Sequence, residues 1–139
     1  MKNSAILLFI LALIGLNSNL SAQAKSAVKP LLEVYYFHTT NRCPTCISIE
    51  ANTKKTLETS FAKELKEGKI KFTVLNSDDD KNKAICEKYE ASGATLILVK
   101  YLNGKETSEN MTNFAFSYSR NQADKFMAGL KEKINSLLK

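Results

Sequence analysis

From residue 31 to the end of the chain, segments typical of β-strands alternate with segments typical of helices. β-branched and aromatic residues mark three strands, and a polar return strand follows, at 31–37, 69–75, 95–102 and 105–111. Apolar residues recur at close to 3.6 positions in three helical segments, at 43–66, 78–93 and 123–137. The resulting order, β-α-β-α-β-β-α, predicts a single α/β sandwich in which helices pack on a sheet.

Three details of this pattern make specific structural predictions. The first helix is expected to bury one apolar face, made of Ile47, Ala51, Leu57, Phe61 and Leu65. Asn103-Gly104 predicts a tight hairpin because both turn positions require positive φ, and the polar return strand after it belongs at a sheet edge. Three alternating aromatic residues suggest a strand or core positions, with an exposed aromatic patch as the alternative: Phe114, Phe116 and Tyr118.

Residues 1–24 have the layout of a secretory signal peptide: a positively charged start, an apolar run at 5–16, and a polar end with Ala22-Gln23-Ala24 as a cleavage site. Cleavage leaves a domain of residues 25–139 in the periplasm or outside the cell, where disulfides persist; cleavage after Ala22 is the alternative. The apolar run is shorter than the ~20 residues of a membrane-spanning helix, and no second span follows. We therefore expect no membrane association after cleavage, and an uncleaved anchor is the other interpretation.

The charge distribution argues against nucleic acid as a partner. The chain has 20 Lys and Arg residues against 14 Asp and Glu residues, a net charge of +6. Almost all of these cations are Lys, interspersed with acidic residues, and no Arg-rich or Arg–aromatic stretch is present that would stack on bases. The chain has one His, which excludes a metal site built from several His residues.

The distinctive chemistry lies in Cys43 and Cys46, a C-x-x-C pair that follows a strand and opens a helix. At a helix N-cap, unpaired backbone N–H groups and the helix dipole favour a thiolate, so the pKa of Cys43 should lie below its usual value of about 8.5. Cys46 lies one turn later and can attack a mixed disulfide held on Cys43. Pro44 suits the first helical position, where its missing N–H costs nothing, and Arg42 should lower the thiolate pKa further.

A zinc site and a structural disulfide are the other uses of such a pair. Closed tetrahedral zinc needs two more ligands, and only Cys86 and His38 are available, so no metal site is expected. A disulfide that closes so short a loop restricts the unfolded chain only modestly. Cys86 is expected to be a buried free thiol, with a regulatory or intermolecular thiol as the alternative. His38 either stabilises the thiolate or bonds to the backbone at the strand end.

Together these residues resemble the thioredoxin superfamily over about residues 31–139. The resemblance rests on the strand VYYF that leads into Cys43-Pro44-Thr45-Cys46, on the segment Gly93–Leu98, and on the hairpin and C-terminal helix. It implies a thioredoxin-like three-layer sandwich around a central mixed sheet of about four strands, with Cys43 as the attacking and Cys46 as the resolving cysteine. It also implies a redox-active disulfide that needs no cofactor, protein thiols or disulfides as substrates, a partner that recharges the pair, and a monomer.

The sequence departs from the superfamily pattern at three places. Ala94, followed by Thr95, stands where members usually have a cis-proline that contacts substrate; a trans peptide is expected here, because the cis form of a non-proline bond costs about 2.5–4 kcal/mol. Phe37 occupies the position of the acid usually buried beneath the resolving cysteine, and Glu50 is either its replacement or a solvated helix residue. The polar segment 39–42 replaces the usual Trp before the attacking cysteine.

The sequence therefore predicts an exported thiol–disulfide oxidoreductase with Cys43 and Cys46 as its catalytic residues. The side chains expected to tune their pKa or to contact substrate are His38, Arg42, Pro44, Thr45, Ala94 and Thr95. The competing prediction, favoured by Ala94 and the missing acid, is a non-catalytic module that binds a protein partner, a metal or an iron–sulfur centre through the C-x-x-C. Reductases, oxidases and isomerases differ in the potential of the pair, so the direction of reaction stays open.

Overall fold

The computed structural model describes residues 29–139, and the predicted signal peptide at 1–24 lies outside the described residues. The strands are β1 (Leu32–His38), β2 (Ile70–Asn76), β3 (Thr95–Leu102) and β4 (Lys105–Asn110). The helices are α1 (Pro44–Ser60), α2 (Ala62–Lys66), the short 3₁₀ helix η1 (Asp80–Asn82), α3 (Lys83–Lys88), α4 (Thr112–Tyr118) and α5 (Ala123–Leu138). Within residues 29–139, no helix has the length and apolar character needed to cross a membrane.

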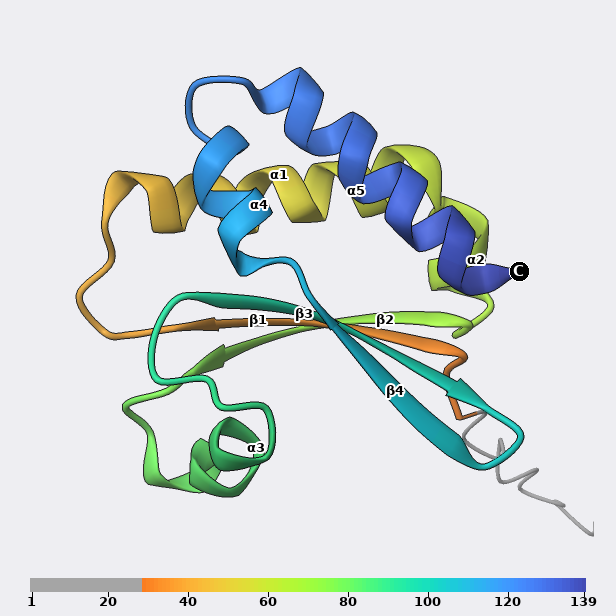
Figure 1. Cartoon of the computed structure of the whole chain (residues 1–139), viewed down its shortest axis with the longest axis horizontal. Helices are drawn as coiled ribbons and strands as arrows, with labels where there is room; N and C mark the ends of the chain where they lie inside the picture. Colours follow the sequence, from red (N-terminus) through yellow and green to blue (C-terminus); the bar gives the residue numbers. More distant parts are fainter. Residues whose placement is uncertain (1–28) are drawn as a thin grey trace, which may run out of the picture.

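The strands form one mixed sheet in the order β2-β1-β3-β4 (Figure 1). β1 is parallel to β2, to which it is connected through α1, and antiparallel to β3. β3 and β4 form an antiparallel hairpin, and its turn residues Asn103 and Gly104 have φ values of 52° and 76°, as Asn-Gly predicted. Every residue of β4 is exposed, which confirms an edge strand. The α/β class and the mixed four-stranded sheet are therefore as predicted.

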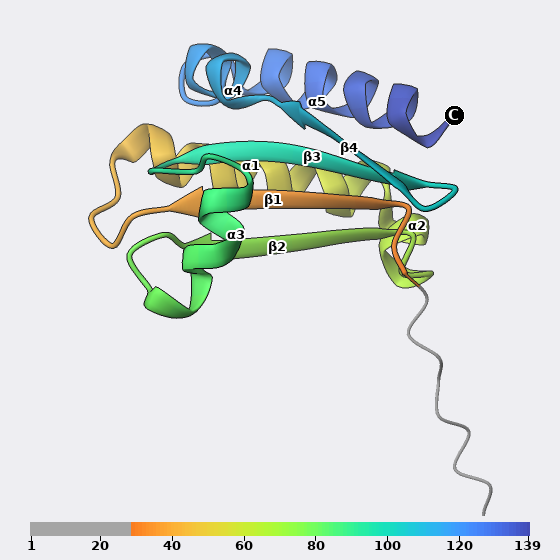
Figure 2. The ribbon, with the colours of Figure 1, turned by 60° about the horizontal axis from the view of Figure 1, so that its bottom comes forward.

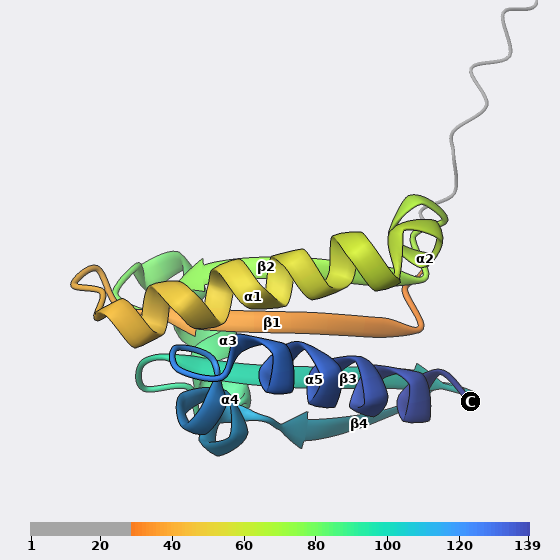
Figure 3. The same ribbon diagram turned by 90° about the horizontal axis from the view of Figure 1, so that it is seen from above.

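Helices lie on both faces of the sheet (Figures 1 and 2). α1, α4 and α5 cover one face and α3 covers the other; viewed from above, α5 runs over β3 (Figure 3). Because successive side chains of a strand point to opposite faces, β1 serves both layers. Leu32, Val34 and Tyr36 belong to the core beneath α1 and α5, whereas Tyr35 and Phe37 belong to the core beneath α3.

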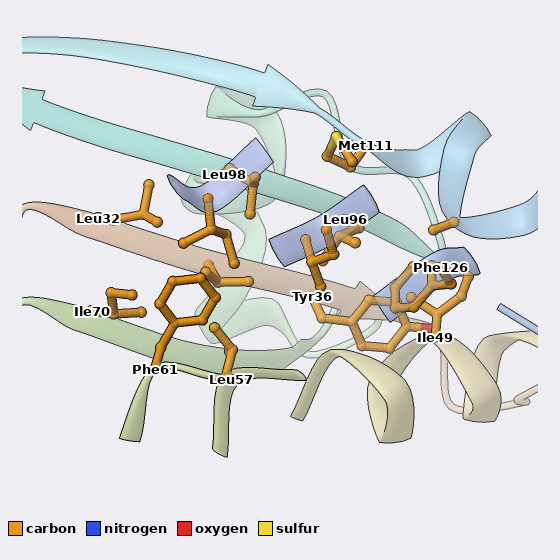
Figure 4. Close-up of a cluster of buried hydrophobic side chains, with 14 residues drawn as sticks. Leu32, Tyr36, Ile49, Leu57, Phe61, Ile70, Leu96, Leu98, Met111 and Phe126 are labelled. Carbon is orange, nitrogen blue, oxygen red and sulfur yellow. The ribbon is translucent and has the colours of Figure 1, made fainter. Parts of the chain in front are cut away.

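The larger of the two cores lies between the sheet and α1, α4 and α5 (Figure 4). Its largest fully buried side chains are Leu32, Tyr36, Ile49, Leu57, Ile70, Leu96, Leu98, Phe126, Leu130 and Ile134. Full burial of one such apolar side chain contributes about 1.5–3 kcal/mol. The larger core therefore fixes the position of α1, the helix that carries the cysteine pair.

The face that α1 buries differs from the predicted one. Leu57 and Phe61 are buried as expected, and Leu65 is partly buried, but Ala51 is exposed and Ile47 exposes 53% of its surface. The buried residues of the helix are Cys46, Ile49, Thr53, Thr56 and Leu57. Thr53 and Thr56 are polar although they face the core, so they interrupt the apolar pattern on the buried face. The sequence pattern therefore included Ile47 and Ala51, which are apolar but face solvent.

One predicted helix is interrupted, and one further helix was not predicted. The expected helix at 43–66 breaks at Phe61, whose φ of −135° and ψ of 28° separate α1 from α2 and whose ring joins the larger core (Figure 4). The strand suggested for the alternating aromatic residues is wrong, because they lie in α4. The core positions suggested as the other interpretation are confirmed for Phe114 and Tyr118, which are partly buried against the larger core. Phe114 and Tyr118 are four residues apart on one face of that helix, with ring centroids 5.0 Å apart. Phe116 is the exposed member, with 44% of its surface accessible.

Gly129, in the interior of α5, makes room for an aromatic ring of α4. A Cβ atom here would lie 2.4 Å from Cζ of Phe114, whose ring also stacks on Phe126. Gly to Ala inside a helix normally stabilises it by up to about 1 kcal/mol. We expect Gly129→Ala instead to lower the free energy of unfolding by about 1–3 kcal/mol, because the ring must move.

Urea unfolding measures this change, and Asn135→Ala at an exposed position of α5 is the matched control. The control tests helix propensity without a clash and should leave stability unchanged or slightly raised. A Gly129→Ala protein as stable as the wild type would contradict the packing described for Phe114.

Candidate functional site

Cys43 and Cys46 form a disulfide at the start of α1, with their Cα atoms 5.0 Å apart. Cys43 has extended backbone angles at the N-cap, and its Sγ accepts a hydrogen bond from the backbone N–H of Cys46 at 3.1 Å. Pro44 occupies the first turn, as expected from its sequence position. Cys43 is exposed, whereas Cys46 exposes only 9% of its surface. An incoming sulfur atom therefore has access to Cys43, and the second cysteine is shielded behind it.

Tyr36 joins the cysteine pair to the central strand β1. Its side chain is fully buried, and its hydroxyl donates a hydrogen bond to the carbonyl oxygen of Cys46 at 2.7 Å. Burial raises the pKa of Tyr36 because the phenolate would lose its hydration, and the nearby Arg42 guanidinium opposes this effect. Tyr36 is therefore a neutral donor at physiological pH, and it holds the first turn of α1 against the sheet.

Arg42, directly before the cysteine pair, forms an ion pair with Glu50. One of its terminal nitrogens lies 2.6 Å from Oε2 of Glu50, and both side chains are partly buried, with 25% and 30% of their surfaces exposed. The guanidinium carbon lies 5.9 Å from the centre of the Tyr36 ring. Glu50 is thus partly exposed and paired with Arg42, and within residues 29–139 no hydrogen bond joins it to a cysteine. That Arg42 lowers the pKa of the Cys43 thiolate remains a prediction. Because Glu50 pairs with Arg42, any such effect also depends on Glu50.

The polar segment before the cysteine pair forms hydrogen bonds with residues 76–78, at the end of β2 and just after it. The backbone N–H of Thr40 donates to Oδ2 of Asp78 at 2.7 Å, and its hydroxyl accepts from the Asn76 amide at 3.0 Å. The carbonyl of His38 accepts from the backbone N–H of Ser77 at 2.7 Å. Hydrogen bonds from Thr40 lower the pKa of Asp78, because they favour its charged form. These hydrogen bonds therefore hold the backbone that leads into the cysteine pair in one conformation.

Ala94 and Thr95, the residues at the expected cis-proline position, lie at the start of β3. No cis peptide bond occurs within residues 29–139, so the bond before Ala94 is trans, as its energetic cost predicts. Thr95 is buried and pairs with Phe37 at the end of β1. Ala94 is partly buried against the larger core. The part that these residues and Thr45 take in substrate contact remains a prediction.

The other two candidate metal ligands do not join the cysteine pair. Cys86 is a buried free thiol, as predicted, and it lies in the core beneath α3 on the other face of the sheet. Burial raises the pKa of Cys86, so it stays protonated at neutral pH. The Nδ1 atom of His38 lies 2.9 Å from the carbonyl oxygen of Thr39, which places its proton on Nδ1. Across residues 29–139, no three His, Cys, Asp or Glu side chains converge as a metal site would require.

A buried acid is present in β1, but on the face opposite α1. Glu33 exposes 9% of its surface and accepts hydrogen bonds from the hydroxyls of Tyr35 and Tyr101, the latter at 3.0 Å. Burial and the neighbouring carboxylate raise the pKa of both tyrosines. The residue pattern held no signal for this cluster, because Glu33 and Tyr101 lie 68 residues apart and meet only in the folded sheet. Since Glu33 belongs to the face covered by α3, it does not supply the missing acid to Cys46.

Comparison with known proteins identifies no family for this chain. No protein-family model matches it, and no curated protein matches it. A solved structure described as "Structure of a malarial protein" aligns with 70% of this chain and 94% of its own length, at 17% sequence identity and a TM-score of 0.42. The site is therefore interpreted from its own geometry.

Proposed function

We propose that this protein is a thiol–disulfide oxidoreductase with a thioredoxin-like fold. The observation that carries the proposal is the Cys43–Cys46 disulfide at the N-terminus of α1, formed by one exposed and one buried cysteine. Such an arrangement favours a thiolate on the exposed residue, because the helix N-terminus stabilises negative charge. The mixed sheet with helices on both faces is compatible with this fold. The signal-peptide pattern supports an exported protein that acts in an oxidising compartment.

The proposed reaction follows from the different exposure of the two cysteines. In the reducing direction, the Cys43 thiolate attacks one sulfur of a substrate disulfide, forms a mixed disulfide and releases the other substrate sulfur as a thiolate. The Cys46 thiolate then attacks Cys43, which restores the intramolecular disulfide and releases the second substrate sulfur. Two electrons pass to the substrate, whose two thiolates take up protons from solvent. In the oxidising direction, a substrate dithiol gives two electrons and two protons, and the reduced pair remains.

The residues around the cysteine pair and a redox partner also have roles in the proposed function. Pro44 starts the helix, and Thr45, His38, Ala94 and Thr95 form the surroundings in which we place substrate contact. The protein would act as a monomer on protein thiols or disulfides, without a cofactor, and a second redox protein would recharge the pair. Nucleic acid and membrane have no part in the proposal.

The alternative candidate is a non-catalytic module that binds a partner through the same loop. It is favoured by Ala94, since the trans peptide at this position does not reproduce the substrate-binding loop of the superfamily. A metal or iron–sulfur centre on this pair would need ligands from a second chain, because the described residues bring no third ligand to the two sulfurs.

The reduction of insulin by dithiothreitol, followed as turbidity, tests for a reductase. Reactivation of a scrambled or a reduced disulfide protein tests for an isomerase or an oxidase. The purified domain of residues 25–139 should accelerate at least one of these reactions in proportion to its concentration. A protein that accelerates none of them would support the binding module instead.

A further inference from the structure

The side chain of Arg42 runs along α1 instead of remaining at the helix start. Arg42 directly precedes Cys43, but its guanidinium contacts Glu50, eight residues further on. Position 50 lies about 9 Å along the helix axis from position 44 at 1.5 Å per residue. Glu50 and Cys46 are four residues apart and therefore share one flank of the helix. The guanidinium of Arg42, the cation adjacent in sequence to the cysteine pair, therefore pairs with a carboxylate in the second turn of α1.

Few contacts besides Glu50 keep Arg42 in this position. Its Nε atom is buried and has no hydrogen-bond partner within residues 29–139. The other neighbour is Tyr36, whose ring centre lies 5.9 Å from the guanidinium carbon and whose hydroxyl, besides donating to the carbonyl of Cys46, interacts with Arg42, an interaction that lowers the Tyr36 pKa against the effect of burial. Removal of the Glu50 carboxylate would therefore leave the guanidinium with no ion-pair partner among the described residues and with Tyr36 as its remaining contact. From there a flexible Arg side chain beside Cys43 can turn toward its sulfur.

We propose that Glu50 is a positioning residue for the redox pair, which holds and neutralises Arg42 and so limits the positive charge presented to the Cys43 thiolate. The inference rests on the proposed function, because it describes how strongly the attacking thiolate is stabilised. A positive charge within about 4–6 Å favours a thiolate, and a paired charge has a much smaller effect. Release of Arg42 should also make the pair easier to reduce, since the thiolate belongs to the reduced form.

The other charged or titratable groups at this end of the sheet are held by hydrogen bonds to groups other than Glu50, whose carboxylate adds only a smaller effect to that of burial on the pKa of Tyr36. Asp78 is held by Thr40 in the preceding loop, and His38 bonds to the backbone. Tyr36 remains a protonated phenol at physiological pH, because burial raises its pKa. Substitution of Glu50 therefore changes one pair of charges and leaves these groups in place.

The test compares the wild type, Glu50→Gln, Arg42→Gln and the double variant, each reduced and with residues 1–24 removed. We expect Glu50→Gln to lower the Cys43 pKa by about one unit, because an unpaired guanidinium favours the thiolate. In the Arg42→Gln background, the same substitution should lower it by less than half as much. The rate of Cys43 alkylation by iodoacetamide as a function of pH, followed by mass spectrometry, gives each pKa. Glu58→Gln, which removes an exposed carboxylate of α1 paired with Lys54, is the matched control and should not change the Cys43 pKa.

Two outcomes would overturn the inference. Glu50→Gln without an effect on the Cys43 pKa would show that Arg42 is not restrained by this pair. An equal effect with and without Arg42 would show that Glu50 acts directly on the sulfur. The alkylation assay needs no redox partner, so its result is independent of the proposed oxidoreductase activity. If the pair is reversible, Glu50→Gln should also shift its equilibrium with glutathione toward the dithiol by up to about tenfold, which is a change of about 30 mV in reduction potential. The full shift applies at a pH above the Cys43 pKa of both the wild type and the variant.

Discussion

Replacement of Cys43 by Ser should reduce thiol–disulfide exchange at least about a thousandfold, to the rate of the uncatalysed reaction, because the attacking thiolate is lost. Cys46→Ala should also abolish turnover, but for a different reason. The exposed Cys43 can still attack a substrate disulfide, while no neighbouring thiol is left to resolve the product. Cys46→Ala should therefore accumulate a mixed disulfide with its substrate, and Cys43→Ser should not.

Non-reducing gel electrophoresis after incubation with a disulfide substrate distinguishes the two variants, and mass spectrometry identifies the sulfur that carries the adduct. Cys86→Ala is the matched control, because this third cysteine is buried on the other face of the sheet. It should retain the wild-type rate and form no adduct. Equal trapping by both active-site variants would contradict the division of roles between an attacking and a resolving cysteine.

Phe126→Ala should be the most destabilising of the substitutions considered in the fold. The Phe126 side chain is fully buried, and its ring stacks on Phe114 with the centroids 5.8 Å apart. Truncation of a buried Phe costs about 3–5 kcal/mol, since it removes apolar contacts and leaves a cavity. A domain of this size typically has 5–15 kcal/mol of stability in total, so most of the margin can be lost.

Urea unfolding of the two proteins gives the difference in free energy, and Phe116→Ala is the matched control. Phe116 is an aromatic residue of neighbouring α4 with 44% of its surface exposed, so its truncation should change stability by no more than about 0.5 kcal/mol. A similar loss in both variants would mean that α4 and α5 do not pack as described.

The sequence predicted the order of strands and helices well because the signals for them are local. Asn103-Gly104 specifies its own turn, and both residues have the positive φ values that this turn needs. The N-cap position of Cys43 follows from its place between a strand and Pro44. The polar strand after the hairpin is exposed along its whole length. In each case a few residues adjacent in sequence are enough to predict the local structure.

Helix length was predicted less well, because tertiary contacts and single backbone angles decide it. The helix expected at 78–93 consists of η1 and the six-residue α3, which ends at Lys88. Glu90 adopts a φ of 52° two residues later, a left-handed conformation more usual for Gly or Asn after a helix. Glu is a good helix former, so the sequence held no signal for this ending.

The surroundings of the cysteine pair depend on contacts between residues distant in the sequence. The Arg42–Glu50 pair spans eight residues, which is longer than the three- or four-residue spacing that indicates a helical ion pair. The bond from Tyr36 to Cys46 depends on the angle at which α1 crosses β1. Glu33 is buried by tyrosines from two strands. Such contacts require the folded arrangement, so they were not available from residue patterns.

Redox titration of the Cys43–Cys46 pair in the domain of residues 25–139 tests the central claim most directly. The protein is equilibrated in thiol buffers of defined potential, and free thiols are then counted by mass-tagged alkylation after denaturation. We predict a reversible two-electron couple in which the count changes from one tag, on Cys86, to three. A potential near −250 mV or below would indicate a reductase, and one from about −200 to −120 mV an oxidase or isomerase. A pair without a reversible couple would contradict the oxidoreductase account and support a binding module.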